Sequence, residues 1–155
     1  MTSSSRLTVT AFMAIVLASA LSRMPILTIG PVQPNLVLIV LLVTGFFTGN
    51  AFFFGLLVAL AAMLVRQTPV LFDVFSVGTA VSAFAAFFIK QHVVWPDRLG
   101  VVLLIICATF FLHLIVAPGF ILAHFGMFAL EVVLSIVIGL ILFELFSLVV
   151  GRRHE

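Results

Sequence analysis

Residues 34–65 read PNLVLIVLLVTGFFTGNAFFFGLLVALAAMLV, and this stretch decides how the chain is built. It holds no charged side chain, and the small residues Thr48-Gly49-Asn50 divide it into two apolar runs. A helix needs about 20 apolar residues to cross about 30 Å of hydrocarbon, so the stretch has room for two short or tilted spans. Because backbone N–H and C=O groups cannot stay unpaired in lipid, both spans are expected to be helices. The stretch therefore predicts a membrane helical hairpin.

The rest of the chain has the same character. Of its 155 residues, 65% are hydrophobic and only 8% are charged, and its mean hydropathy is +1.46. That leaves too little polar surface to coat a soluble globule. We expect one membrane domain over residues 1–155, without a soluble domain on either side of the bilayer. The net charge of +2 comes from basic residues at the ends of apolar runs, which orient a protein in lipid and do not indicate nucleic-acid binding.

The apolar runs predict an all-α integral membrane protein, a compact bundle of six transmembrane helices. The first run is expected to be a retained helix rather than a cleaved signal peptide, because the chain after it also spans the membrane. The fourth run is rich in small residues, so its helix is expected to be the best suited to burial among its neighbours. The expected helices cover about residues 7–24, 34–48, 51–65, 70–89, 99–117 and 128–150.

The basic residues predict the topology. An even number of spans places both termini on one side, and cytoplasmic sides of membranes carry the excess of Lys and Arg. With cytoplasmic termini, that side holds Arg6, Lys90, Arg98, Arg152 and Arg153, and the other side holds Arg23 and Arg66. The charge count therefore favours cytoplasmic termini.

Ionisable residues inside spans cost a few kcal/mol at the bilayer centre, so each is a candidate functional residue. There are four: Asp73, His113, Glu131 and Glu144. Asp73 lies near the start of the fourth helix. There its carboxylate is either solvated at the membrane interface or stabilised by the helix dipole. The single cysteine, Cys107, is expected to serve packing, and one cysteine can form neither an intramolecular disulfide nor a cysteine-based metal site.

His113 and Glu131 are each about one turn from the outer ends of their helices, so they are expected at similar depth. They could pair, either as a structural interhelical hydrogen bond, which is commoner, or as a proton relay or ligand site. Glu144 lies 13 residues beyond Glu131, about 140° around the helix and about 20 Å along it. The two glutamates therefore cannot share one site, and Glu144 is expected to reach the cytoplasmic interface or a partner helix.

The chain carries no recognisable catalytic pattern. It has no His-x-x-x-His spacing, no phosphate-binding loop and no pair of nearby carboxylates. We therefore expect a non-enzymatic protein that needs no cofactor or metal.

Several short motifs resemble the rod shape-determining protein MreD family. They are Pro34-Asn35-Leu36 at the start of an apolar helix, a glycine-bearing hairpin turn, and Leu71-Phe72-Asp73 followed by Gly78. The resemblance implies a scaffold of bacterial cell-wall elongation in the cytoplasmic membrane. Its implied partners are MreC, MreB filaments, and the RodA glycosyltransferase with its penicillin-binding partner. A homo-oligomer of this chain is a further alternative. Pro34, Asn35 and Asp73 would be matching positions with structural roles. At the hairpin turn MreD-like chains usually carry basic residues, and this chain does not.

A second resemblance is to the substrate-binding membrane subunit of an energy-coupling-factor vitamin transporter. That class also has six short helices, and here Ala14-x-x-x-Ala18 on the first helix would dock onto the coupling subunit. This function requires a pocket reachable from the outer side, at the level of His113 and Glu131. The outer loops are short and apolar, which leaves few groups to specify a vitamin.

Overall fold

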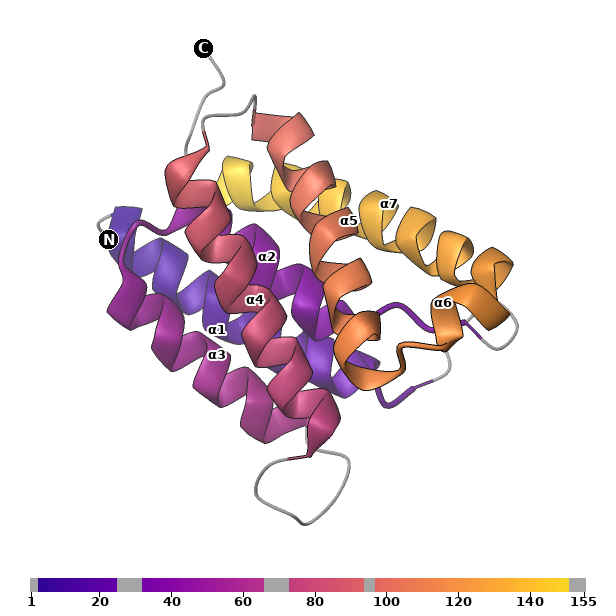
Figure 1. Ribbon diagram of the computed structural model, residues 1–155. Helices are drawn as coiled ribbons and strands as arrows, with labels where there is room; N and C mark the ends of the chain where they lie inside the picture. The colour runs from indigo at the N-terminus through magenta and orange to yellow at the C-terminus, as the bar shows by residue number, and fades with distance from the viewer. Residues whose placement is uncertain (1–2, 25–31, 66–72, 94–96, 151–155) are drawn as a thin grey trace.

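The computed structural model describes residues 3–24, 32–65, 73–93 and 97–150. The described residues form a bundle of helices (Figure 1), which confirms the all-helical prediction for this part of the chain. The helices are α1 (Ser3–Leu21), α2 (Leu36–Phe47), α3 (Ala51–Val65), α4 (Val74–His92), α5 (Asp97–Val116), α6 (Phe120–Ala123) and α7 (Phe125–Val150).

The predicted hairpin is present, and residues 48–50 separate α2 from α3. Asn50 ends the turn, because its side-chain oxygen accepts hydrogen bonds from the backbone N–H groups of Phe52 and Phe53, at 3.0 and 3.1 Å. Those N–H groups have no partner inside the helix, so an asparagine here starts α3. The predicted start of this helix at residue 51 is confirmed, and all of residues 51–65 are helical.

Other predicted boundaries were wrong by a few residues. Helix α1 ends at Leu21, and residues 22–24 form a turn instead of continuing to residue 24. Helix α4 begins at Val74 and ends at His92, whereas the prediction was 70–89. Asp73 is thus the residue before α4 and not a residue within it. Residues 70–72, Arg66, Arg152 and Arg153 lie outside the described part of the chain.

A short helix was missed. Residues 120–123, expected to be an apolar connection, form α6, and α7 begins at Phe125, three residues earlier than predicted. The backbone N–H of His124 bonds the carbonyl of Phe120, at 2.8 Å, and the N–H of Phe128 bonds the carbonyl of His124, at 3.1 Å. The described residues therefore hold seven helices, where six were predicted.

The centre of the bundle is α2. All twelve of its residues are buried, and it contacts α1, α3, α4, α5 and α7. Figure 1 shows α2 behind α4, in the middle of the molecule. The expectation that residues 70–89 form the best-buried helix was therefore wrong, because α4 buries only the face that carries Ser76, Gly78, Thr79, Ser82, Ala83, Ala86 and Phe87.

Three described helices are long and apolar enough to cross a membrane, namely α4, α5 and α7. Large apolar side chains are exposed on the bundle, among them Leu148 at 77% and Phe52 at 84%. Apolar surface of this kind is suited to contact with lipid rather than water. The described part of α1, together with α2 and α3, is apolar but shorter. The twelve residues of α2 reach about 18 Å, and protein encloses them.

Helices α5 and α7 run in opposite directions and are joined at three levels. Arg98 pairs with Glu144 near one end, and His113 pairs with Glu131 near the other. Between them Gly139 faces Ile105 so closely that a Cβ at residue 139 would overlap the isoleucine side chain. A glycine here lets the two helices approach, as in other membrane helix pairs. These two polar contacts lie about 20 Å apart along each helix, so together they fix the register of α5 against α7.

Candidate functional site

A cavity of about 830 Å³ lies at the end of the bundle where α1, α3 and α5 end and α2 begins. Its polar wall consists of Ser22, Arg23, Gln33, Asn35, His113 and Glu131. Its apolar wall includes Val37, Phe75, Leu112, Val116, Phe120 and Met127. Cavities of this size, with apolar walls and a few convergent polar groups, are typical of sites for small organic molecules.

A largely buried polar contact in this wall joins His113 of α5 to Glu131 of α7. Their Nε2 and Oε2 atoms are 3.1 Å apart, and their side chains are only 16% and 11% exposed. The other ring nitrogen, Nδ1, lies 3.0 Å from the carbonyl oxygen of Thr109. A carbonyl only accepts hydrogen bonds, so Nδ1 carries a hydrogen. One further proton then lies between Nε2 and Oε2, and the pair has no net charge whichever atom holds it.

Phenylalanines hold the His113 ring in place. The ring stacks on Phe120 of α6, with centroids 5.2 Å apart and planes at 26°. Phe128 of α7 meets the ring edge-on, at 5.4 Å and 76°. The missed helix α6 therefore helps to build the site. The sequence signals it only by Pro118-Gly119 followed by four apolar residues, too few to display a helical period.

The rim of the cavity is made by side chains that bond backbone carbonyls just after α1 and at the end of α3. Arg23 Nη2 donates to the carbonyl of Leu64, at 3.1 Å, and Gln33 Nε2 donates to that of Ser22, at 2.6 Å. Carbonyls at helix ends lack partners within the helix, so these bonds are expected to order both ends. In the sequence, Arg23 is marked only as a charge that orients the chain, and Gln33 carries no signal of its contact.

Asn35 connects the start of α2 to α4. Its Oδ1 accepts from the backbone N–H of Leu38, at 3.0 Å, and its Nδ2 donates to Thr79 Oγ1, at 3.3 Å. Asp73 caps α4 in the same way, because its Oδ1 accepts from the N–H of Ser76, at 2.6 Å. Pro34 lines the cavity beside Asn35, whereas Asp73 does not line it.

Replacing Asn35 tests this connection. Asn35→Ala removes both side-chain bonds and is expected to cost about 1 kcal/mol of stability, whereas Asn35→Asp keeps an acceptor for Leu38 and should cost less. The measurement is the thermal midpoint of each purified variant in one mild detergent. Equal midpoints for the two variants would contradict a capping role.

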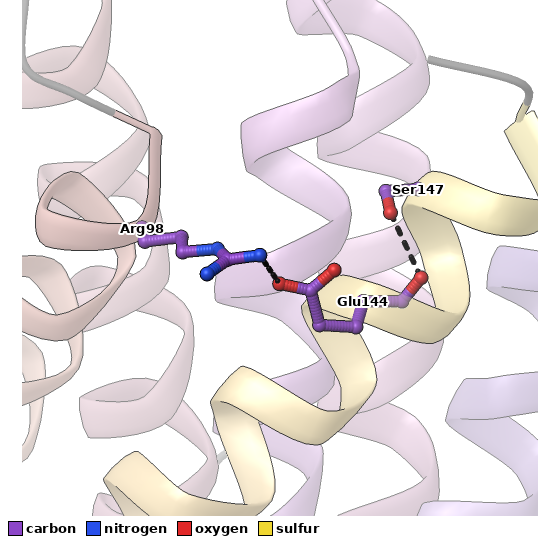
Figure 2. Close-up of polar contacts among 3 residues, drawn as sticks. All are labelled: Arg98, Glu144 and Ser147. Carbon is purple, nitrogen blue, oxygen red and sulfur yellow. Dashed lines mark hydrogen bonds and ion pairs between the residues drawn. The ribbon is translucent and has the colours of Figure 1, made fainter. Parts of the chain in front are cut away.

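Glu144 lies at the opposite end of the α5–α7 pair and outside the cavity. Its Oε1 is 2.8 Å from Arg98 Nη2, and the two side chains are 43% and 69% exposed. Figure 2 shows Arg98 reaching across to this carboxylate, while Ser147 Oγ donates to the backbone oxygen of Glu144, at 2.9 Å. Glu144 thus reaches a partner helix, and the two glutamates occupy separate places, as their spacing along the helix predicts.

The chemistry available at the cavity is hydrogen bonding, charge attraction and proton exchange. Within the described residues, no three His, Cys, Asp or Glu side chains lie together as a metal site. Cys107, expected to pack inside, is exposed on the surface of α5, away from the cavity-lining residues. The sequence does not show whether Cys107 faces lipid or the protein interior, because both environments favour apolar residues.

Comparisons of the chain with protein-family models, with curated proteins and with solved structures found no match.

Proposed function

We propose that this chain is a non-enzymatic membrane scaffold of the bacterial cell-wall elongation machinery, similar to MreD. One observation supports this most strongly. The two stretches that carry the resemblance, 34–36 and 71–78, lie far apart in sequence, yet their described parts lie together. Asn35 bonds Thr79, the residue after Gly78, at 3.3 Å, and Asn35 and Asp73 each cap a helix. Motif residues that build one structural unit are more informative than the same residues scattered over the bundle.

The proposed scaffold lies in the cytoplasmic membrane with both termini in the cytoplasm. In this proposal, α1, α2 and α3 cross the bilayer together with the longer helices α4, α5 and α7, which gives six spans. The distribution of basic residues supports this orientation. The proposed partners are MreC, MreB filaments, and RodA with its penicillin-binding synthase.

The test is a pull-down of the tagged chain from its native membranes in mild detergent, followed by mass spectrometry. Recovery of MreC or the elongation synthase is the expected result. A tagged inner-membrane protein of similar size and unrelated function serves as the control. Recovery of an ATPase pair with a coupling membrane subunit would overturn the scaffold.

A second candidate function is that of a transporter's substrate-binding subunit, and the cavity is the observation that favours it. Its volume of about 830 Å³ and its His113–Glu131 contact suit a small ligand. The proposed docking face does not support it, because Ala18 is 5% exposed and Ala14 packs against the core of this same chain. That face is occupied inside the bundle, so the scaffold remains the first proposal.

A further inference from the structure

We propose that the cavity binds a small amphipathic monoanion, with its charged group at Arg23 and its apolar part against the wall of Phe75, Leu112 and Phe120. This site goes beyond scaffolding, and it does not depend on which partners the chain has. Three features of the cavity support it: its charge, its walls and its size.

Among the described residues that line the cavity, the net charge is positive. The His113–Glu131 pair contributes no net charge, because one proton lies between the two side chains. Arg23 bonds a backbone carbonyl, and within the described residues it makes no ion pair with an acid. The guanidinium has five N–H donors in a planar fork that matches a carboxylate or a phosphate. One positive charge at the rim of a cavity with largely apolar walls favours a ligand with one negative charge.

The walls and the volume suit a larger occupant than a bare ion. About 830 Å³ is many times the volume of an inorganic anion, and Phe75, Leu112, Val116, Phe120 and Met127 offer such an ion no hydrogen bonds. An apolar body of drug-like size would cover these side chains. The ligand therefore needs both an anionic head and an apolar or aromatic body.

The His113–Glu131 pair gives the ligand a second polar contact. Because the pair has no net charge, it can form hydrogen bonds with an uncharged ligand group, such as a hydroxyl, an amide or a ring nitrogen. Because the pair and Arg23 both line the cavity, a ligand with a charged group and a separate neutral hydrogen-bonding group would suit it.

Two sources could supply this chemistry, a free organic acid from the aqueous side or the headgroup of an anionic lipid. A cavity at the end of a membrane bundle can be reached by both. The experiment below separates them.

The test uses three probes that each carry a phenyl ring on a four-carbon chain and differ in the terminal group: 4-phenylbutyrate, 4-phenylbutan-1-ol and 4-phenylbutylamine. The purified full chain in phosphatidylcholine nanodiscs is titrated with each by calorimetry, against empty nanodiscs. The anion is expected to bind at least tenfold more tightly than the alcohol and the amine. Arg23→Gln should remove this preference and Arg23→Lys should largely keep it. Arg98→Gln, a matched loss of charge outside the cavity, should leave it unchanged.

Equal affinity for the three probes would overturn the proposal, as would a preference that survives Arg23→Gln. If Arg23→Gln does not fold, Ala117→Phe replaces it, because a ring at this lining position should occupy the cavity and weaken phenylbutyrate binding at least tenfold. Unchanged binding to that variant would also overturn the site. Competition by added phosphatidylglycerol assigns the site to a lipid headgroup, and lack of competition assigns it to a free acid.

Discussion

Gly139→Leu is expected to destabilise the bundle by about 3 kcal/mol or to prevent it from folding. A Cβ at residue 139 would overlap Ile105 of α5 and lie 3.4 Å from Ile39 Cγ2 of α2, and leucine adds three more carbons. Ile39 and Ile105 are both buried, at 1% and 0% exposure, so neither can move into open space. The measurement is the melting midpoint in mild detergent, with the folded fraction from size-exclusion chromatography.

Gly126→Leu is the matched control, because it makes the same change in the same helix. Nothing lies within 4 Å of a Cβ at residue 126, and leucine has a higher helix propensity than glycine. This variant should melt at or above the wild-type midpoint. Similar losses in both variants would contradict the close approach of α7 to α2 and α5.

The second large effect is expected at the His113–Glu131 pair. Either His113→Leu or Glu131→Leu leaves one polar group with little access to water, and each is expected to cost about 2 kcal/mol. The double variant replaces both partners with apolar side chains and should cost less than the sum of the two, with a coupling of about 1 kcal/mol. Melting midpoints of the four proteins in one detergent complete this double-mutant cycle.

The Arg98–Glu144 pair provides the comparison cycle on the same two helices. Its side chains are 69% and 43% exposed, and exposed pairs contribute little. Arg98→Leu and Glu144→Leu should therefore combine almost additively in detergent. Additive losses at the buried pair, or stronger coupling at the exposed one, would contradict the assigned burial of these contacts.

The hairpin could be predicted from sequence because its turn is marked by local chemistry. Asn50 caps α3 through two backbone N–H groups, and the start of α3 at Ala51 was predicted correctly. The similar depth of His113 and Glu131, which allows them to pair, was also predicted from sequence, because distance from the helix ends sets depth in a membrane. Depth can be counted along a chain without knowledge of its packing.

The central position of α2 and the cavity could not be predicted. Helix α2 is apolar on every side, and α7 is nearly so; lipid and a protein interior both accept such a surface. The sequence therefore does not indicate whether α2 faces lipid or the protein interior. Arg23 and Gln33 bond backbone carbonyls of Leu64 and Ser22, contacts that exist only once the helix ends have been brought together.

The most direct test of the site is the accessibility of a cysteine placed in it. The variant is Ala117→Cys in a Cys107→Ser background, labelled in intact cells with a maleimide that cannot cross membranes. Ser135→Cys, at a position that is 1% exposed within α7, is the protected control. We predict that residue 117 is labelled from outside and residue 135 is not. Labelling of residue 117 only after the membrane is opened would place the cavity on the cytoplasmic side, and no labelling at all would contradict an open cavity.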